Sequence, residues 1–75
     1  MTLWSTSQPA NMWLEFRHAH DNRLRIMLDI LRVRSITEME TATRIVLDNG
    51  DPYDVHEDYD TVHRMLIEAI NRVQA

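Results

Sequence analysis

The sequence predicts a small α+β domain, with an antiparallel sheet of three to five strands and one C-terminal amphipathic helix packed on one face. Two segments carry this prediction. Asn49-Gly50 stands between two apolar, strand-like runs, which is a strong mark of a β-hairpin. Residues 58–75 repeat apolar side chains at helical spacing. Because the chain has 75 residues and no cysteine, we expect a single domain without disulfide bonds.

The first segment, residues 1–11, is polar and is expected to form a loosely held arm before a single domain at residues 12–75. It lacks the basic region and apolar stretch of a signal peptide. No apolar run in the chain approaches the length of about 20 residues that crosses a bilayer. We therefore expect a cytoplasmic protein that has no membrane partner.

Residues 12–31 fit both a pair of strands and a helix. Apolar residues alternate on either side of a polar turn, which predicts strands near 12–19 and 23–30. Aromatic residues before the turn favour these strands, and residues 32–40 continue as a further strand. Four apolar residues also fit the template of a helix over 22–34, which would leave a single β-hairpin in the domain: Leu24, Met27, Leu28 and Leu31.

The hairpin around Asn49-Gly50 has a predictable register. A three-residue loop, 48–50, with Gly50 in the left-handed region would place Ile45 opposite Tyr53. A two-residue loop would mix polar and apolar residues on both faces of the hairpin. The three-residue loop instead collects one set of side chains on a single face: Thr43, Ile45, Leu47, Tyr53 and Val55.

The last helix is expected to start near Asp58 or Asp60, since either carboxylate can accept hydrogen bonds from the free N–H groups of the first turn. Met65 and Ile67 would widen its buried face. The central apolar stripe, which we expect to pack on the sheet, contains Val62, Leu66, Ala69, Ile70 and Val73.

Charge is unevenly distributed along the chain, whose net charge is −4. Residues 1–36 contain five arginines and three acidic residues, whereas residues 37–75 contain three arginines and nine acidic residues. An Arg-rich sheet face could bind single-stranded nucleic acid, which is one alternative function. The sequence pI of about 5.4 argues against this alternative, because nucleic-acid-binding domains are usually basic. The arginines concerned are Arg17, Arg23, Arg25, Arg32 and Arg34.

Histidines give the second alternative function, a metal-binding domain. His18 and His20 would share one face of a strand, because side chains two residues apart point to the same side. With His56 and His63 they could bind zinc or nickel if the fold brought them together. No recognised ligand spacing such as HExxH is present, so we expect no metal and no other cofactor.

The second half of the chain, from about Val33, carries a recognisable pattern of residues: Ile36, Glu38, Thr43, Ile45, Leu47, Asn49, Gly50, Val55, Glu57 and Val62. In this pattern it resembles the swarming-motility (FlbD) family of small flagellar proteins. The resemblance implies a strand pair followed by a C-terminal amphipathic helix. It is not extended to a flagellar role, because the N-terminal half has no counterpart in the family.

The function that these patterns favour is protein interaction. A single helix can cover only one side of the sheet, and the other side would expose apolar residues, which is typical of an interaction surface. We expect a self-associating module, most simply a homodimer, or a module that binds another protein. The chain has one glycine and no catalytic motif, so we do not expect an enzyme. The expected interface residues are Trp4, Trp13, Phe16, Arg23 and Arg25, because Trp and Arg are enriched at binding hot spots.

Overall fold

The computed structural model describes residues 12–74, with side chains as far as residue 72. The predicted arm and its Trp4 lie outside the described residues. The elements follow in the order β1 (Trp13–Arg17), β2 (Arg25–Asp29), the 3-10 helix η1 (Ile30–Arg32), β3 (Val33–Glu38), β4 (Thr43–Leu47), β5 (Pro52–Val55) and α2 (Tyr59–Gln74). None of the described helices is long and apolar enough to span a membrane.

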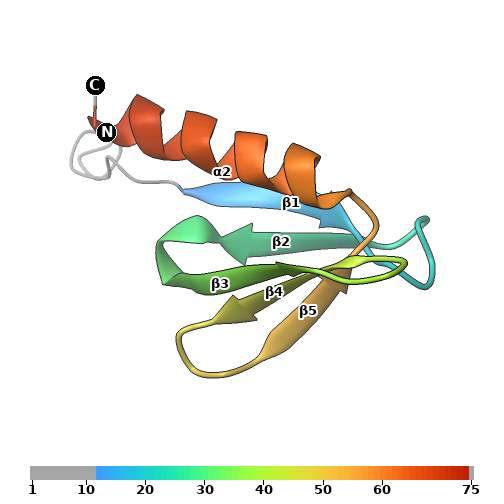
Figure 1. The fold of residues 1–75 in the computed structure, drawn as a ribbon. Coiled ribbons are helices and arrows are strands. Elements are labelled where there is room, and N and C mark those ends of the chain that lie inside the picture. The colour runs from blue at the N-terminus through green and yellow to red at the C-terminus, as the bar shows by residue number, and fades with distance from the viewer. Residues whose placement is uncertain (1–11, 75) are drawn as a thin grey trace, which may run out of the picture.

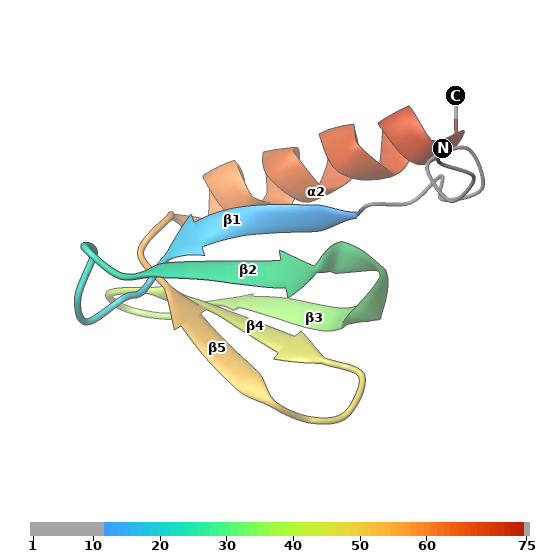
Figure 2. The same cartoon turned by 180° about the vertical axis from the view of Figure 1, so that it is seen from behind.

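The strands form two antiparallel sheets, one of β1 and β2 and one in the order β3-β4-β5. An isolated antiparallel bridge between His18 and Val55 joins the end of β1 to the end of β5. The five strands follow one another across the molecule, and α2 lies lengthwise beside β1 (Figures 1 and 2). The predicted α+β fold, with antiparallel strands and one C-terminal helix, is therefore confirmed, and its five strands are divided between two small sheets.

Residues 22–34 belong largely to the first hairpin, so the alternative prediction of a helix over this segment is wrong. This segment forms β2, one short 3-10 turn and the start of β3. Burial alternates along β2, with Leu28 buried and Met27 exposed, so the period is that of a strand. Asp29 starts the 3-10 turn, because its carboxylate accepts a hydrogen bond from the Leu31 N–H at 3.0 Å. The chain therefore turns after β2 and does not continue as a helix.

The second hairpin has the register that the loop chemistry predicts. Ile45 lies opposite Tyr53, and Thr43 lies opposite Val55. The Gly50 N–H donates to the Leu47 carbonyl at 2.9 Å, and Gly50 has φ of +92°. Other residues rarely adopt this backbone conformation, and a glycine adopts it at no steric cost. The Asn-Gly signal therefore set both the length of the loop and the face that each strand buries.

Helix α2 closes the core against both sheets. The Asp58 carboxylate caps its first turn by accepting the Thr61 N–H at 2.8 Å. Val62 is fully buried and Ala69 nearly so, as the apolar stripe predicts.

The stripe prediction is wrong for Ile70, which is 38% exposed, and the Val73 side chain lies outside the described residues. The prediction that Ile67 widens the buried face is wrong, since this side chain is 45% exposed. Ile67 lies five residues after Val62, which places it about 140° around the helix from the core.

The core consists of two adjoining clusters. The larger one joins both sheets to the helix, and the smaller one contains Met12, Ile30 and Ala69. Leu14, Val33 and Leu66 pack against both clusters and connect them. The buried members of the larger cluster are Phe16, Leu28, Ile45, Leu47, Val55 and Val62.

Glu57, in the segment between β5 and α2, holds that segment against the two sheets. Its backbone carbonyl accepts a 2.8 Å hydrogen bond from the buried hydroxyl of Thr43. Its carboxylate oxygens accept the Arg17 N–H at 3.0 and 3.2 Å. These contacts satisfy polar groups at the junction of the sheets, where an unpaired group would be costly. Glu57 therefore has a structural role here.

Candidate interaction surface

The β1–β2 hairpin has one face turned to the core and one turned outward. We call the set of side chains that point outward the outer face. The strand register arranges them in three rows of opposed residues: Trp13 with Asp29, Glu15 with Met27, and Arg17 with Arg25. Every second residue of a strand points to the same side, so these side chains lie together. The other side chains of the hairpin, such as Phe16 and Leu28, point into the core.

Two large apolar side chains of the outer face are open to solvent. Trp13 is 52% exposed and Met27 is 53% exposed. They occupy neighbouring rows on opposite strands, a diagonal separation within reach of an aromatic side chain. Single exposed apolar residues are normal, but a tryptophan beside a methionine between charged residues is typical of a binding surface.

The charge of the outer face changes from one end to the other. Arg17 and Arg25 lie directly opposite each other, an arrangement that disfavours the isolated hairpin. Arg17 donates to the Asn22 carbonyl at 3.1 Å, and neither arginine forms an ion pair with another residue of the described range. The opposite end carries the negative charge of Asp29. The face thus has a cationic end and an end with a carboxylate and an indole.

The structure places the predicted interface residues in different environments. Trp13 and Arg25 lie on the outer face. Arg23 lies at the tip of the hairpin, where it pairs with Asp21 at 3.1 Å. That ion pair and a backbone hydrogen bond hold the pKa of the Asp21 carboxyl below its ordinary value. Arg23 is exposed but belongs to the turn and not to the sheet face.

Phe16 requires a correction, because it is 1% exposed and lies in the core. The sequence prediction grouped it with Trp13 on one uncovered side. The two residues are three apart, and an odd separation along a strand places side chains on opposite faces. Phe16 is therefore unavailable to a partner of the folded domain.

Four further residues of the outer face were not among the predicted interface residues, although Arg17 was named for the nucleic-acid alternative. They carry no individual signature, since methionine, arginine and acidic residues occur on most surfaces. The period of two would have found them once both strands and their register were fixed. They are Glu15, Arg17, Met27 and Asp29.

The four histidines do not come together as a metal site. His18 and His20 lie side by side, with ring centroids 5.7 Å apart, and the His20 N–H donates to Nδ1 of His18 at 3.1 Å. His56 lies in a separate hollow, and His63 stacks on Tyr59 along the helix. Within residues 12–74 no three His, Asp or Glu side chains are placed to hold a metal ion. The chain folds His56 and His63 into surroundings other than those of the His18–His20 pair, which sequence spacing could not show.

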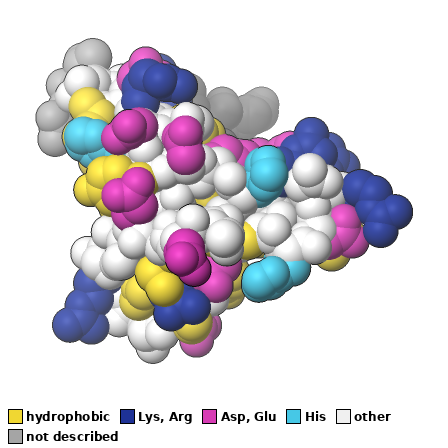
Figure 3. Space-filling model, turned by 45° about the vertical axis from the view of Figure 1, so that its right-hand side comes forward, with side chains coloured by type: hydrophobic (Ala, Val, Ile, Leu, Met, Phe, Trp, Pro, Cys, Tyr) yellow, Lys and Arg dark blue, Asp and Glu magenta, His cyan; other side chains and the backbone are white. Residues whose placement is uncertain are grey.

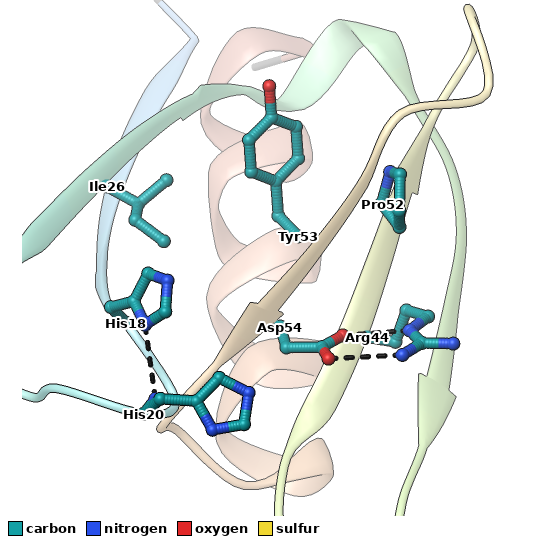
Figure 4. A pocket seen from close by; sticks show the side chains of 7 residues that line it. All are labelled: His18, His20, Ile26, Arg44, Pro52, Tyr53 and Asp54. Carbon is teal, nitrogen blue, oxygen red and sulfur yellow. Dashed lines mark hydrogen bonds and ion pairs between the residues drawn. The ribbon is translucent and has the colours of Figure 1, made fainter.

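A small pocket of about 180 Å³ lies beside the His18–His20 pair (Figure 4). In the lining of this pocket, the Arg44 guanidinium donates two hydrogen bonds of 2.8 and 3.1 Å to the Asp54 carboxylate. Asp54 has a pKa below its ordinary value, mainly because of the Arg44 hydrogen bond, with smaller contributions from His20 and His18. Arg44 and Asp54 thus neutralise each other's charge at this pocket.

The Arg44–Asp54 pair predicts a pH-dependent contribution to stability. The folded state lowers the pKa of Asp54 from 3.8, so the stabilisation is present above that value and disappears as pH falls through the folded pKa. Asp54→Asn should reduce the free energy of unfolding near neutral pH by less than about 1 kcal/mol, because both side chains are partly exposed. The difference from the unmodified protein should vanish in strong acid. Urea unfolding at several pH values, with Glu68→Gln as control, tests this; an equal loss at every pH would contradict it.

The end of the molecule where α2 begins is mainly acidic. Figure 3 shows Asp and Glu side chains over the middle of this face, with Arg side chains at its borders. A shallow hollow of about 260 Å³ opens there, lined in part by Glu38, Glu40, His56 and Asp58. Asp58 is already used as the helix cap, and the Thr61 hydrogen bond lowers its pKa. Glu38 and Glu40, the other acids that line the hollow, are exposed to solvent.

The arginines proposed for nucleic acid do not form one surface. Arg17 and Arg25 lie on the outer face, whereas Arg34 belongs to the other sheet. Arg32 pairs with Asp48 at 3.3 Å. The cationic end of the outer face therefore contains only two of the five predicted arginines, which weakens the case for a nucleic-acid surface.

Comparison with family models, with curated proteins and with solved structures finds no match to this chain. The resemblance of its second half to the swarming-motility family therefore stays a prediction.

Proposed function

We propose that the protein is a small interaction module that self-associates through the outer face of its β1–β2 hairpin, most simply as a homodimer. The observation that carries this proposal is the exposure of Trp13 and Met27 on one sheet face. The same face bears two arginines that form no ion pair with any residue of the described range. Trp and Arg dominate the energetics of protein interfaces.

The alternation of burial supports the same conclusion. The inward side of the hairpin already packs against the helix and the other sheet, so the outer face is not needed for the core. A solvent-facing row in a monomer would be expected to carry small or polar residues in place of Trp13 and Met27. A small domain also gains stability when a second subunit buries further apolar surface.

The proposal is tested by sedimentation velocity on the full chain over a range from low to high micromolar concentration, at physiological salt. We expect the sedimentation coefficient to rise with concentration from that of a monomer to that of a dimer. A sedimentation coefficient that stays at the monomer value throughout would contradict self-association.

A further inference from the structure

Resting on the proposed function, we propose a specific arrangement of the second copy. Two outer faces pack against each other about a two-fold axis that runs across the strands, in the plane of the interface. This axis lays the cationic end of each face on the Trp13–Asp29 end of the other. The partner is therefore a second copy of this chain, recognised through an alternation of charge along its own strands.

The three rows of the outer face determine the axis. Successive rows lie about 7 Å apart, so the two ends of the face are separated by about 13 Å. A two-fold axis across the strands exchanges these ends while keeping β1 over β1 and β2 over β2. Trp13 then lies over the partner subunit's Arg17, and Asp29 lies over the partner subunit's Arg25.

Both end contacts are favourable. A guanidinium over the face of an indole gains cation–π energy, most of all where water is excluded. A carboxylate forms strong charge-assisted hydrogen bonds with a guanidinium, and within residues 12–74 only one Asp29 oxygen accepts a hydrogen bond, from the Leu31 N–H. Each contact occurs twice in the dimer because of the symmetry. The closely opposed Arg17–Arg25 pair of each hairpin is thereby neutralised by its partner.

The other simple axis, along the strands, gives a poor match. It would exchange β1 with β2 and lay Arg17 over the partner subunit's Arg25, so that four guanidinium groups met at one end. Like charges brought together at an interface are strongly unfavourable, and this arrangement is therefore rejected.

The middle row lies on the favoured axis. Met27 meets its own copy there and forms an adaptable apolar centre. Glu15 also meets its own copy, but Arg17 lies two residues along the same strand and reduces the repulsion. Because the contact is the same patch on both subunits, it closes as a dimer and does not propagate into a fibre.

A mixing experiment with two charge-reversed variants tests this arrangement. Arg25→Asp alone should weaken self-association by at least about tenfold, because two symmetry-related contacts become repulsive. Asp29→Arg alone should have the same effect, for the same reason. An equimolar mixture should recover dimers, since the two guanidinium groups of the Asp29→Arg chain would then face the two carboxylates of the Arg25→Asp chain. Sedimentation velocity on each variant and on the mixture measures this.

Asp29 also caps the 3-10 turn, so the fold of each variant is checked by circular dichroism. If Asp29→Arg is unfolded, Asp29→Asn replaces it in the mixture, because the asparagine side chain keeps an acceptor for the Leu31 N–H. The mixture of Asp29→Asn with Arg25→Asp should recover dimers in part. Dimers of unchanged strength in the single variants, or no recovery in the mixture, would overturn the arrangement and leave self-association standing. A monomeric unmodified protein would overturn both proposals.

Discussion

Phe16→Ala is expected to leave a large fraction of the protein unfolded. The ring is 1% exposed and packs in the cluster that joins both hairpins to α2. Truncation of a buried phenylalanine costs about 3–5 kcal/mol, from lost apolar transfer and from the cavity that remains. Domains of this size have a total stability of a few to about 10 kcal/mol, so the loss is a large share of it. Urea unfolding followed by circular dichroism measures the change.

A matched control separates this effect from a general sensitivity of the hairpin. Leu24 lies in the same hairpin but is 55% exposed, so Leu24→Ala should change the free energy of unfolding by no more than about 0.5 kcal/mol. If Phe16→Ala proved as stable as Leu24→Ala, the assignment of Phe16 to the core would be wrong.

Trp13→Ala is expected to show the opposite behaviour, with a stable fold and a lost interface. Trp13 is 52% exposed, so its truncation creates no buried cavity in the monomer. At a dimer interface it would be a hot spot, whose truncation costs about 2 kcal/mol or more, or roughly a 30-fold rise in dissociation constant. Sedimentation velocity gives the dissociation constant, and circular dichroism confirms the fold.

Leu24→Ala again supplies the control for Trp13→Ala, because Leu24 has a similar exposure but lies at the hairpin tip. We expect it to dimerise as the unmodified protein does. If Trp13→Ala and Leu24→Ala had equal dissociation constants, the interface would have to be placed elsewhere.

The second hairpin shows how far local sequence can define structure. The Asn-Gly pair limits the loop, and Gly50 accepts the positive φ that a three-residue loop requires. Only one register then collects the apolar residues of β4 and β5 on one side. Arg44 faces Asp54 in that register, because the same alternation sets the opposite face.

The outer face was only partly predictable, for a geometric reason. Its anchor, Trp13, stands out by residue type, but its other members become visible only when the register of β1 and β2 is known. Phe16 was misplaced because residue type outweighed the alternation, although three residues separate it from Trp13. The closeness of His18 and His20 agrees with their two-residue spacing, but the placement of His56 and His63 relative to them could not be predicted, since it depends on tertiary packing.

Chemical cross-linking at Glu15 tests the central claim most directly. This exposed residue lies on the proposed two-fold axis, and the chain has no cysteine to compete with a new thiol. Glu15→Cys should be joined to its own copy by a short bis-maleimide, since facing sheets lie about 10 Å apart. Thr41→Cys, in the exposed loop before β4, should remain monomeric on a denaturing gel under the same conditions. Equal cross-linking of the two variants, or none at residue 15, would contradict pairing through the outer face.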